Sequence, residues 1–202
     1  MATACHEVAV EAGWRLRTLL RSRRFHDVGN LICMFKSHLL PLIESSTPAI
    51  FHAAESHLAV LDRIQDRFLR EIDMSKETAL LHFNLAPLRC RRNIAMLELI
   101  HRTSLGRGPH FRRWFFPREE AQHAPTRLSV RRHPRQLHDF VKGNHTDYLA
   151  RSALGMVRVY NALPCFIVEQ TSVKEIQHEL QNMLKRSAEE QREDWLFIFP
   201  CR

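Results

Sequence analysis

A stripe of apolar side chains at helical spacing is the feature that most constrains the fold of this chain. Leu58, Leu61, Ile64, Phe68 and Ile72 follow one another every three or four positions, which places them on one face of a helix. Charged side chains fill the opposite face, namely Asp62, Arg63, Asp66, Arg67 and Arg70. The pattern predicts an amphipathic helix that ends near Ile72 and buries its apolar face in a core.

Two further helices are predicted before this stripe. From Val8 to Arg24, apolar residues occur at helical spacing and arginines occupy the remaining faces, which is typical of a basic amphipathic helix. Asp27 is placed to cap a second helix, whose broad apolar surface indicates burial on more than one side. The stretch from Ser45 to Pro48 is expected to break this second helix.

A short helix and a long one are predicted next along the chain. Ser75 is placed to start the short helix, and the long helix is expected from Pro87 to about Leu105. Proline suits a first helical turn because it lacks the N–H group that would be unpaired there. Apolar residues lie nearly all round the long helix, so we expect it to be the central buried helix, ending at Gly106.

The C-terminal part contains one ambiguous element and one clear one. Residues 148–161 fit either a short helix or a strand, and their pattern does not separate the two. Ser172, with Glu175 three residues later, forms a capping box. Apolar residues at helical spacing, including Ile176 and Leu180, then predict a last amphipathic helix.

The low glycine content agrees with packed helices. Only 6 of the 202 residues are Gly, and Leu, Ile, Val and Phe are plentiful, which argues against extensive disorder. We therefore predict a mainly α protein, an irregular multi-helix domain with a long basic loop and a short C-terminal helical element. The predicted regions are a helical region at 1–75, central buried helices at 76–110, a basic irregular linker at 111–147, and a C-terminal element with the capped amphipathic helix at 148–202.

The charge balance favours a polyanionic partner. Lys and Arg total 30 against 22 Asp and Glu, for a formal net charge of +8, and Arg suits bidentate phosphate contact better than Lys does. Between Phe111 and Arg135, arginines alternate with aromatic residues, a combination that holds single strands and hybrid duplexes. Alternatively, Phe115 and Phe116 anchor a core and the arginines are merely solvated. The candidate nucleic-acid-binding residues are Arg15, Arg21, Arg24, Arg112, Arg113, Arg131, Arg132 and Arg135.

The segment from Phe111 to Asp147 lacks a helical apolar period and contains three prolines. Ordering its backbone would cost roughly 1–2 kcal/mol per residue, which burial offsets poorly here. We therefore expect it to be the least ordered interior stretch, ordered by a partner. Its arginines are expected to contribute little to folding stability, because exposed charges contribute little.

No pattern of catalytic or metal-binding residues occurs in the sequence. The aspartates are scattered, whereas a two-metal polymerase site needs grouped carboxylates, and the 13 His lack the paired spacing of a zinc site. We therefore expect no enzyme activity, no cofactor and no metal. The five scattered Cys indicate reduced thiols, and neither a membrane span nor a targeting signal is seen. An intracellular protein, nuclear or cytoplasmic and without a membrane partner, is expected.

Five short strings stand in a definite order along the chain. They are Phe35 to Pro41 (FKSHLLP), Leu61 to Arg70 (LDRIQDRFLR), Leu88 to Leu97 (LRCRRNIAML), Arg132 to Leu137 (RHPRQL) and Tyr160 to Pro164 (YNALP). Together they resemble the thumb and C-terminal extension of non-LTR (LINE-like) retrotransposon reverse transcriptases, and the helix after Ser172 occupies the place of that family's closing helix. Tyr160 stands where Trp is usual in the family, and Ile176 stands where Phe is usual.

The resemblance implies that region 1–75 is thumb-like and that the catalytic palm is lacking. The chain would then be a catalytically inactive fragment of an RNA-directed DNA polymerase, able to bind RNA or an RNA/DNA hybrid electrostatically. Tyr160, Asn161, Leu163 and Pro164 would be a structural motif in which the aromatic ring inserts under the closing helix, the amide caps or turns the backbone, and the proline ends the element. The alternative is a helical protein-interaction module, whose exposed apolar face meets the missing palm domain or a second copy.

Overall fold

The computed structural model describes residues 2–107, 115, 133–139, 141, 147–190 and 194–199. These residues are mainly helical and include no β-strand, which confirms the predicted fold class. The elements in chain order are α1 (Ala2–Arg21), η1 (Arg23–Phe25), α2 (Val28–Met34), η2 (Phe35–Leu39), α3 (Leu40–Glu44), α4 (Thr47–Ile50), α5 (Glu55–Glu71), α6 (Lys76–Phe83), α7 (Leu88–Ser104), α8 (Asp147–Ala150), α9 (Met156–Ala162), α10 (Cys165–Val168), α11 (Val173–Glu189) and η3 (Trp195–Phe197).

The chain divides into two compact units. The first comprises residues 1–92 and 185–196, and the second comprises residues 93–184 and 197–202. The boundary falls inside α7 and inside α11, so each of these helices contributes residues to both units. The division therefore differs from the four regions predicted along the sequence, which follow loops and helix ends.

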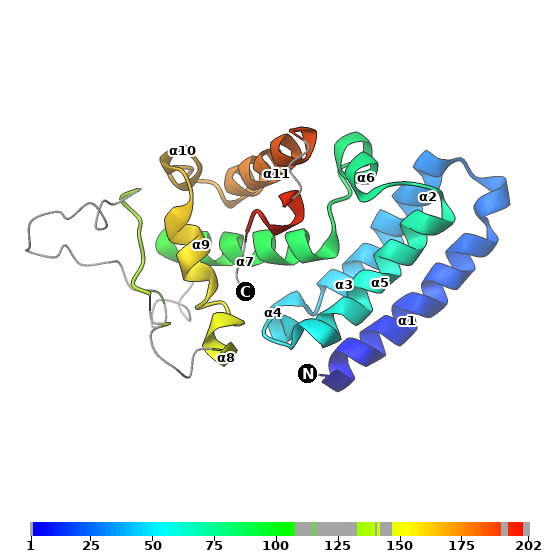
Figure 1. Ribbon diagram of the computed structural model, residues 1–202, viewed down its shortest axis with the longest axis horizontal. Helices are drawn as coiled ribbons and strands as arrows, with labels where there is room; N and C mark the ends of the chain where they lie inside the picture. The colour runs from blue at the N-terminus through cyan, green and yellow to red at the C-terminus, as the bar shows by residue number, and fades with distance from the viewer. Residues whose placement is uncertain are drawn as a thin grey trace, which may run out of the picture. The chain divides into compact units, whose positions relative to one another are not determined.

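The first unit is built on three helical segments that run up, down and up (Figure 1). α1 and α5 run in the same direction and pack closely, while α2, η2 and α3 together form the returning segment. The face of α1 that packs inward is lined by the small side chains Cys5, Ala9 and Ala12. Small side chains allow a close approach of two helix backbones, because little volume separates them.

The returning segment is one helix with a wide turn in its middle. η2 is a π-helical turn, in which the Leu40 N–H donates to the carbonyl of Phe35. Pro41 follows directly and has no N–H to donate, which disturbs the α-helical ladder here. The ring of Phe35 stacks on that of Phe68 from α5, with centroids 4.3 Å apart. Both side chains are fully buried.

Several predicted helix ends are confirmed and one predicted cap is wrong. The Ser75 hydroxyl accepts a hydrogen bond from the Thr78 N–H (3.0 Å) and caps α6. Asp27 occupies the N-cap position of α2, but its carboxylate makes no capping hydrogen bond. Instead its backbone carbonyl accepts from the Leu31 N–H. Gly106 ends the last turn of α7 with a φ of 75°, a left-handed conformation that glycine adopts without strain.

The first turns of α7 anchor this helix to the first unit through ion pairs. Arg92, whose side chain is only 6% exposed, donates two hydrogen bonds to Asp62 of α5 (2.7 and 2.9 Å). Arg91 pairs in the same way with Glu44 of α3, and Arg89 pairs with Glu55 (3.1 Å). Fork-shaped contacts between guanidinium and carboxylate are strong and directional, so these arginines are engaged in folding.

A buried glutamine holds the chain where it enters α7. Gln65, which is 2% exposed, donates from Nε2 to the carbonyl of Ala86 (3.1 Å) and accepts at Oε1 from the N–H of Leu88 (3.0 Å). Its side chain thus satisfies two backbone groups at the start of the helix. The predicted first-turn proline, Pro87, lies one residue before α7, and its carbonyl accepts from the Arg91 N–H.

The second unit contains the C-terminal helices and the later part of α7. Residues 148–161, for which helix and strand stayed open, form α8, the following turn and most of α9. α11 begins directly after Ser172, as the capping box predicts, and buries Ile176, Leu180 and Leu184 completely. Gly155 lies so close to the carbonyl of Ala150 that an added Cβ would come within 2.0 Å of its oxygen, so only glycine fits here.

Replacing Gln65 by Met, which keeps the length of the side chain, should lower the free energy of unfolding. The Ala86 carbonyl and the Leu88 N–H would each lose a buried partner, at a cost of about 1–3 kcal/mol per group. Urea denaturation followed by circular dichroism measures the change. Arg63→Ala on the exposed face of α5 is the control. Equal stability of the two variants would contradict the role assigned to Gln65.

Candidate nucleic-acid interface

The predicted nucleic-acid-binding arginines fall into three groups. Arg15 and Arg21 lie on α1, and Arg24 lies on η1, all in the first unit. Arg135 belongs to the second unit. The remaining members, Arg112, Arg113, Arg131 and Arg132, lie outside the described residues. The same holds for most of the predicted basic linker between Phe111 and Asp147.

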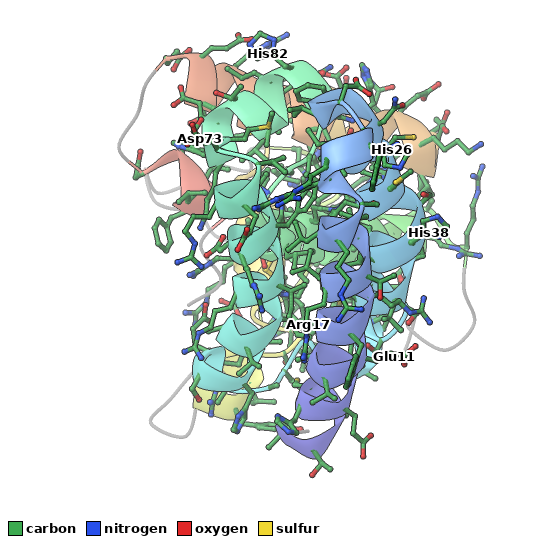
Figure 2. All side chains as sticks on the ribbon, turned by 90° about the vertical axis from the view of Figure 1, so that its right-hand side faces the viewer. Glu11, Arg17, His26, His38, Asp73 and His82 are labelled. Carbon is green, nitrogen blue, oxygen red and sulfur yellow. The ribbon has the colours of Figure 1, made fainter. Side chains whose placement is uncertain are left out.

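A cleft of about 390 Å³ opens between α1, η1 and α5 in the first unit. Figure 2 shows Arg17 on the side of α1 that faces α5, the side on which this cleft lies. Two predicted residues therefore lie in the same cleft, together with arginines that the sequence did not single out. The lining residues are Arg17, Leu20, Arg21, Arg23, Arg24, Arg67 and Glu71.

The cleft holds five arginines and one carboxylate. Arg23 pairs with that carboxylate, Glu71, at 2.6 Å. The other four arginines have no carboxylate within 4.0 Å among the described residues. Like charges that line one cleft repel one another, and Glu71 offsets this repulsion for Arg23 alone among the cleft arginines. An anion placed in the cleft would relieve it, and exposed guanidinium groups are well suited to hold phosphate.

A contact with an aromatic ring orients Arg17. Its guanidinium carbon lies 4.5 Å from the centre of the Trp14 ring, one helical turn earlier on α1. A guanidinium over an indole face is held by cation–π attraction, worth about 0.5–1 kcal/mol at an exposed site. The contact restricts both side chains, so less conformational freedom remains to be lost when a ligand binds.

Arg15 lies on the opposite flank of α1 and is not part of the cleft. It forms an ion pair with Glu11 one turn earlier on the helix (2.5 Å) and donates to the carbonyl of His38 on η2 (3.3 Å). Figure 2 shows Glu11 and His38 on this side of α1, away from Arg17. The guanidinium group of Arg15 is therefore already engaged, and the structure separates it from Arg21 and Arg24.

Arg135 makes structural contacts within the second unit. Its guanidinium donates to the carbonyls of Val168 (2.9 Å) and Gln170 (3.3 Å), at and just beyond the C-terminal end of α10. Carbonyls at a helix end lack intrahelical partners and carry partial negative charge, so a cation is favourable there. This position supports a role for Arg135 in folding. The sequence-based expectation was that arginines of this segment are exposed and contribute little to stability.

A buried polar network surrounds Tyr160 in the second unit. The Tyr160 hydroxyl lies 3.1 Å from His101 Nδ1 and 2.9 Å from Ser104 Oγ, both on α7. His101 Nε2 lies 2.9 Å from the carbonyl of Gln170, which can only accept. Nε2 therefore carries the proton, and in the neutral ring Nδ1 accepts from the tyrosine hydroxyl. Tyr160 is therefore buried with its hydroxyl on α7, while its insertion under the closing helix stays a prediction.

Two histidines of this network are held neutral. Burial lowers the pKa of His101, and the nearby Arg135 and His133 lower it further. Burial likewise lowers the pKa of His133, whose Nε2 donates to the Tyr160 carbonyl. The other nitrogen of His133, Nδ1, is buried without a partner. Protonation of either ring would add a buried positive charge, which costs free energy unless it is paired.

The neighbouring motif residue Asn161 ties two segments together. Its amide donates to the Leu137 carbonyl (2.7 Å), and its Oδ1 accepts from the Leu137 N–H (2.8 Å). Leu163 is buried, and Pro164 occupies the N-cap position of α10. Asn161 therefore bridges to another of the five strings, whereas the sequence suggested a local cap or turn. Phe115, one of the two proposed core anchors, is also buried.

The described residues contain no cluster suited to catalysis by a metal. Within them, no three His, Cys, Asp or Glu side chains converge to hold an ion. Burial raises the pKa of the Cys90 thiol to about 12, which keeps it protonated and a poor nucleophile. No helix in the described part of the chain is long and apolar enough to cross a membrane. The arginine cleft offers positive charge instead of such a cluster.

Arg17, Arg23 and Arg67 line the cleft but were not among the predicted residues. The spacing on α1 contained a signal for Arg17, because residues four apart lie on one helix face and Arg17 precedes Arg21 by four. No comparable signal pointed to Arg67. Its place in the cleft depends on how α1 and α5 pack, which the two separate helical patterns do not specify.

Comparison with known proteins adds no relative. No protein-family model, curated protein or solved structure matches this chain.

Arg135→Gln should destabilise the second unit by about 1–3 kcal/mol, because two backbone carbonyls lose a charged donor. Chemical denaturation provides the measurement. Arg102→Gln, at an exposed position on α7, removes the same charge without a buried contact and should have little effect. Unchanged stability of Arg135→Gln, together with weaker binding to RNA, would instead place Arg135 at a nucleic-acid surface.

The stability of the protein should also fall as the solution is acidified. The folded-state pKa values of His101 and His133 lie below the usual value of 6.5, so the unfolded chain binds protons first as pH falls. Stability is therefore fully present above about pH 6.5 and is lost below it, by up to about 1.4 kcal/mol per pH unit for each proton taken up.

The free energy of unfolding at about pH 7.5 and about pH 5.5 tests this expectation. The variant His101→Gln keeps a donor for the Gln170 carbonyl but cannot titrate. Its stability should change less between the two pH values than that of the wild type. An equal change in both proteins would show that His101 does not contribute to the pH dependence.

Proposed function

We propose that this chain is a catalytically inactive fragment of a retrotransposon reverse transcriptase-like protein that binds RNA or an RNA/DNA hybrid through the arginine cleft of its first unit. The observation that carries the proposal is the charge imbalance of the cleft, where four of five arginines have no carboxylate partner among the described residues. Such a surface attracts a polyanion through counterion release, without reading its sequence.

The arrangement of the cleft suits a linear chain of phosphates. Arg17 and Arg21 lie one turn apart on α1, a rise of about 6 Å, and Arg24 follows on η1. Arg67 faces them from α5. Arginines spaced in this way can contact several successive phosphates of a strand at once. A single small anion could reach only some of them.

The five strings support the part of the proposal that concerns the reverse transcriptase-like fold. Gln65 and Arg92, which belong to two of them, make buried hydrogen bonds in the first unit. Tyr160 and Asn161 do the same in the second unit. Buried polar groups with specific partners tolerate substitution poorly, which is the behaviour expected of residues that characterise a family. The proposal places no catalytic step on this chain.

A protein-interaction module is the alternative, and exposed apolar side chains favour it. Phe25 is 83% exposed, and Val10, Trp14 and Val28 are also exposed in the first unit. Exposed apolar side chains of this size are candidates for contact with other proteins. The two functions differ in solution, because only the interaction module predicts association of the protein that persists at high salt and without nucleic acid.

Replacing Arg21, Arg24 and Arg67 together by Gln should weaken binding of single-stranded RNA and of an RNA/DNA hybrid. Fluorescence anisotropy at several salt concentrations measures the affinity. The slope of log affinity against log salt should flatten by about 0.7 per lost contact for single strands and about 0.9 for duplexes. Thermal stability should change little, since exposed charges contribute little to folding.

The matched control replaces three arginines outside the cleft, Arg63, Arg70 and Arg102, by Gln. It removes the same net charge and should retain most of the affinity. Equal losses in both triple variants would mean that only net charge matters and that the cleft is not the site. The absence of any salt-dependent binding by the wild type at about 10 µM protein would reject the proposed function.

A further inference from the structure

A second depression, about 550 Å³ in volume, lies on the other flank of α1 in the first unit. It opens between α1 and the helix formed by α2 and η2, so α1 separates it from the arginine cleft. Leu19, Met34 and Leu39 give it apolar walls, and Trp14 stands at one side. The polar residues that complete the lining are Arg15, Thr18, Ser22 and His38.

Trp14 lies between the cleft and this pocket. Its side chain is 61% exposed, which is unusual for the largest apolar side chain in a protein. Arg17, which lines the cleft, covers one face of the indole. The same indole borders the pocket. The Trp14 ring is thus held by Arg17 of the cleft on one side, and it borders the apolar pocket on the other.

We propose that this pocket receives an unpaired base of a single-stranded nucleic acid, stacked on Trp14, while the phosphates of the strand lie on the arginine cleft. The inference rests on the proposed function and specifies it further, since it selects single strands over duplexes. A base in a duplex is paired and stacked and cannot enter the pocket. A base in a single strand is free to stack on an aromatic side chain.

The charges around the pocket fit this occupant. The arginines of the cleft lie on one side of α1 and would hold the phosphates of a strand whose base enters the pocket on the other side. Such a strand carries both components that the surface offers to bind, namely negative phosphates and flat apolar bases. An apolar peptide would fill the pocket but leave the arginines unpaired, so the charges favour a nucleic acid.

The pocket should select bases weakly. The hydroxyls of Thr18 and Ser22 donate to the carbonyls of Trp14 (3.2 Å) and Leu19 (2.7 Å) within α1 itself. Their protons are therefore committed to the helix. Arg15 is engaged by Glu11 and by the His38 carbonyl. Apart from the His38 ring, few donors in the lining remain to read the edge of a base, so stacking dominates, and stacking tolerates any base.

Anisotropy titrations with three fluorescent probes test the proposal. The probes are a single-stranded oligonucleotide of about 12 residues, a strand of equal length and charge without bases, and a duplex of the same sequence. The wild type should bind the single strand best. Trp14→Ala should lower affinity for it by roughly 10-fold, while Trp14→Phe should restore most of the loss because a ring remains.

Further readouts separate stacking from a general loss of structure. Trp14→Ala should leave the salt slope unchanged, because the number of phosphate contacts is the same. It should weaken binding of the baseless strand only slightly, through loss of the Arg17 cation–π contact. Thr18→Glu, which places a carboxylate at the mouth of the pocket, should also weaken single-strand binding. Phe166→Ala removes another exposed aromatic side chain, on α10, and serves as the matched control with unchanged affinity.

The outcomes distinguish this inference from the proposed function. If the triple arginine variant loses binding while Trp14→Ala and Thr18→Glu bind like the wild type, the pocket is not a base site and the proposed function stands. Equal affinity of the wild type for strands with and without bases would also overturn the inference. If neither the arginine nor the tryptophan variants change binding, the proposed function fails as well.

Discussion

The close packing of α1 against α5 is the constraint on which the first unit depends. Small side chains at Cys5, Ala9 and Ala12 let the two helices approach, and that approach brings Arg67 beside the arginines of α1. The buried face of α1 packs on α5, η2 and α3, so the two edges of that face lie beside different neighbours. One flank meets α5 and becomes a charged cleft, and the other meets α2 and η2 and becomes an apolar pocket.

Buried polar side chains, rather than apolar packing alone, determine how the loops join the helices. Gln65 holds the chain at the entry to α7, and Asn161 holds the backbone of Leu137. Each side chain pairs with one backbone N–H and one backbone carbonyl, groups that have no partner from a regular helix. Buried backbone groups without partners are costly, so a single amide can select one path for a loop among many that would pack equally well.

The sequence predicted the helices well because amphipathic spacing is a local property. The stripe from Leu58 to Ile72 corresponds to α5, and the cap at Ser75 is present. The roles of arginines could not be predicted in this way, since Arg15, Arg21 and Arg135 look alike in a sequence. Arg15 is paired, Arg21 lies in the cleft, and Arg135 holds helix-end carbonyls. These differences arise only when distant segments meet.

The wide turn of η2 determines which residues of its helix lie on the buried face. Leu31, Phe35, Leu39 and Ile43 are four residues apart and all buried, yet a regular α-helix would rotate such a series by about 120° over its length. The π-helical turn takes up that rotation and keeps the series on one face. A chain one residue shorter in this stretch would turn either the first or the last of these side chains toward water, so helix length here is as constrained as composition.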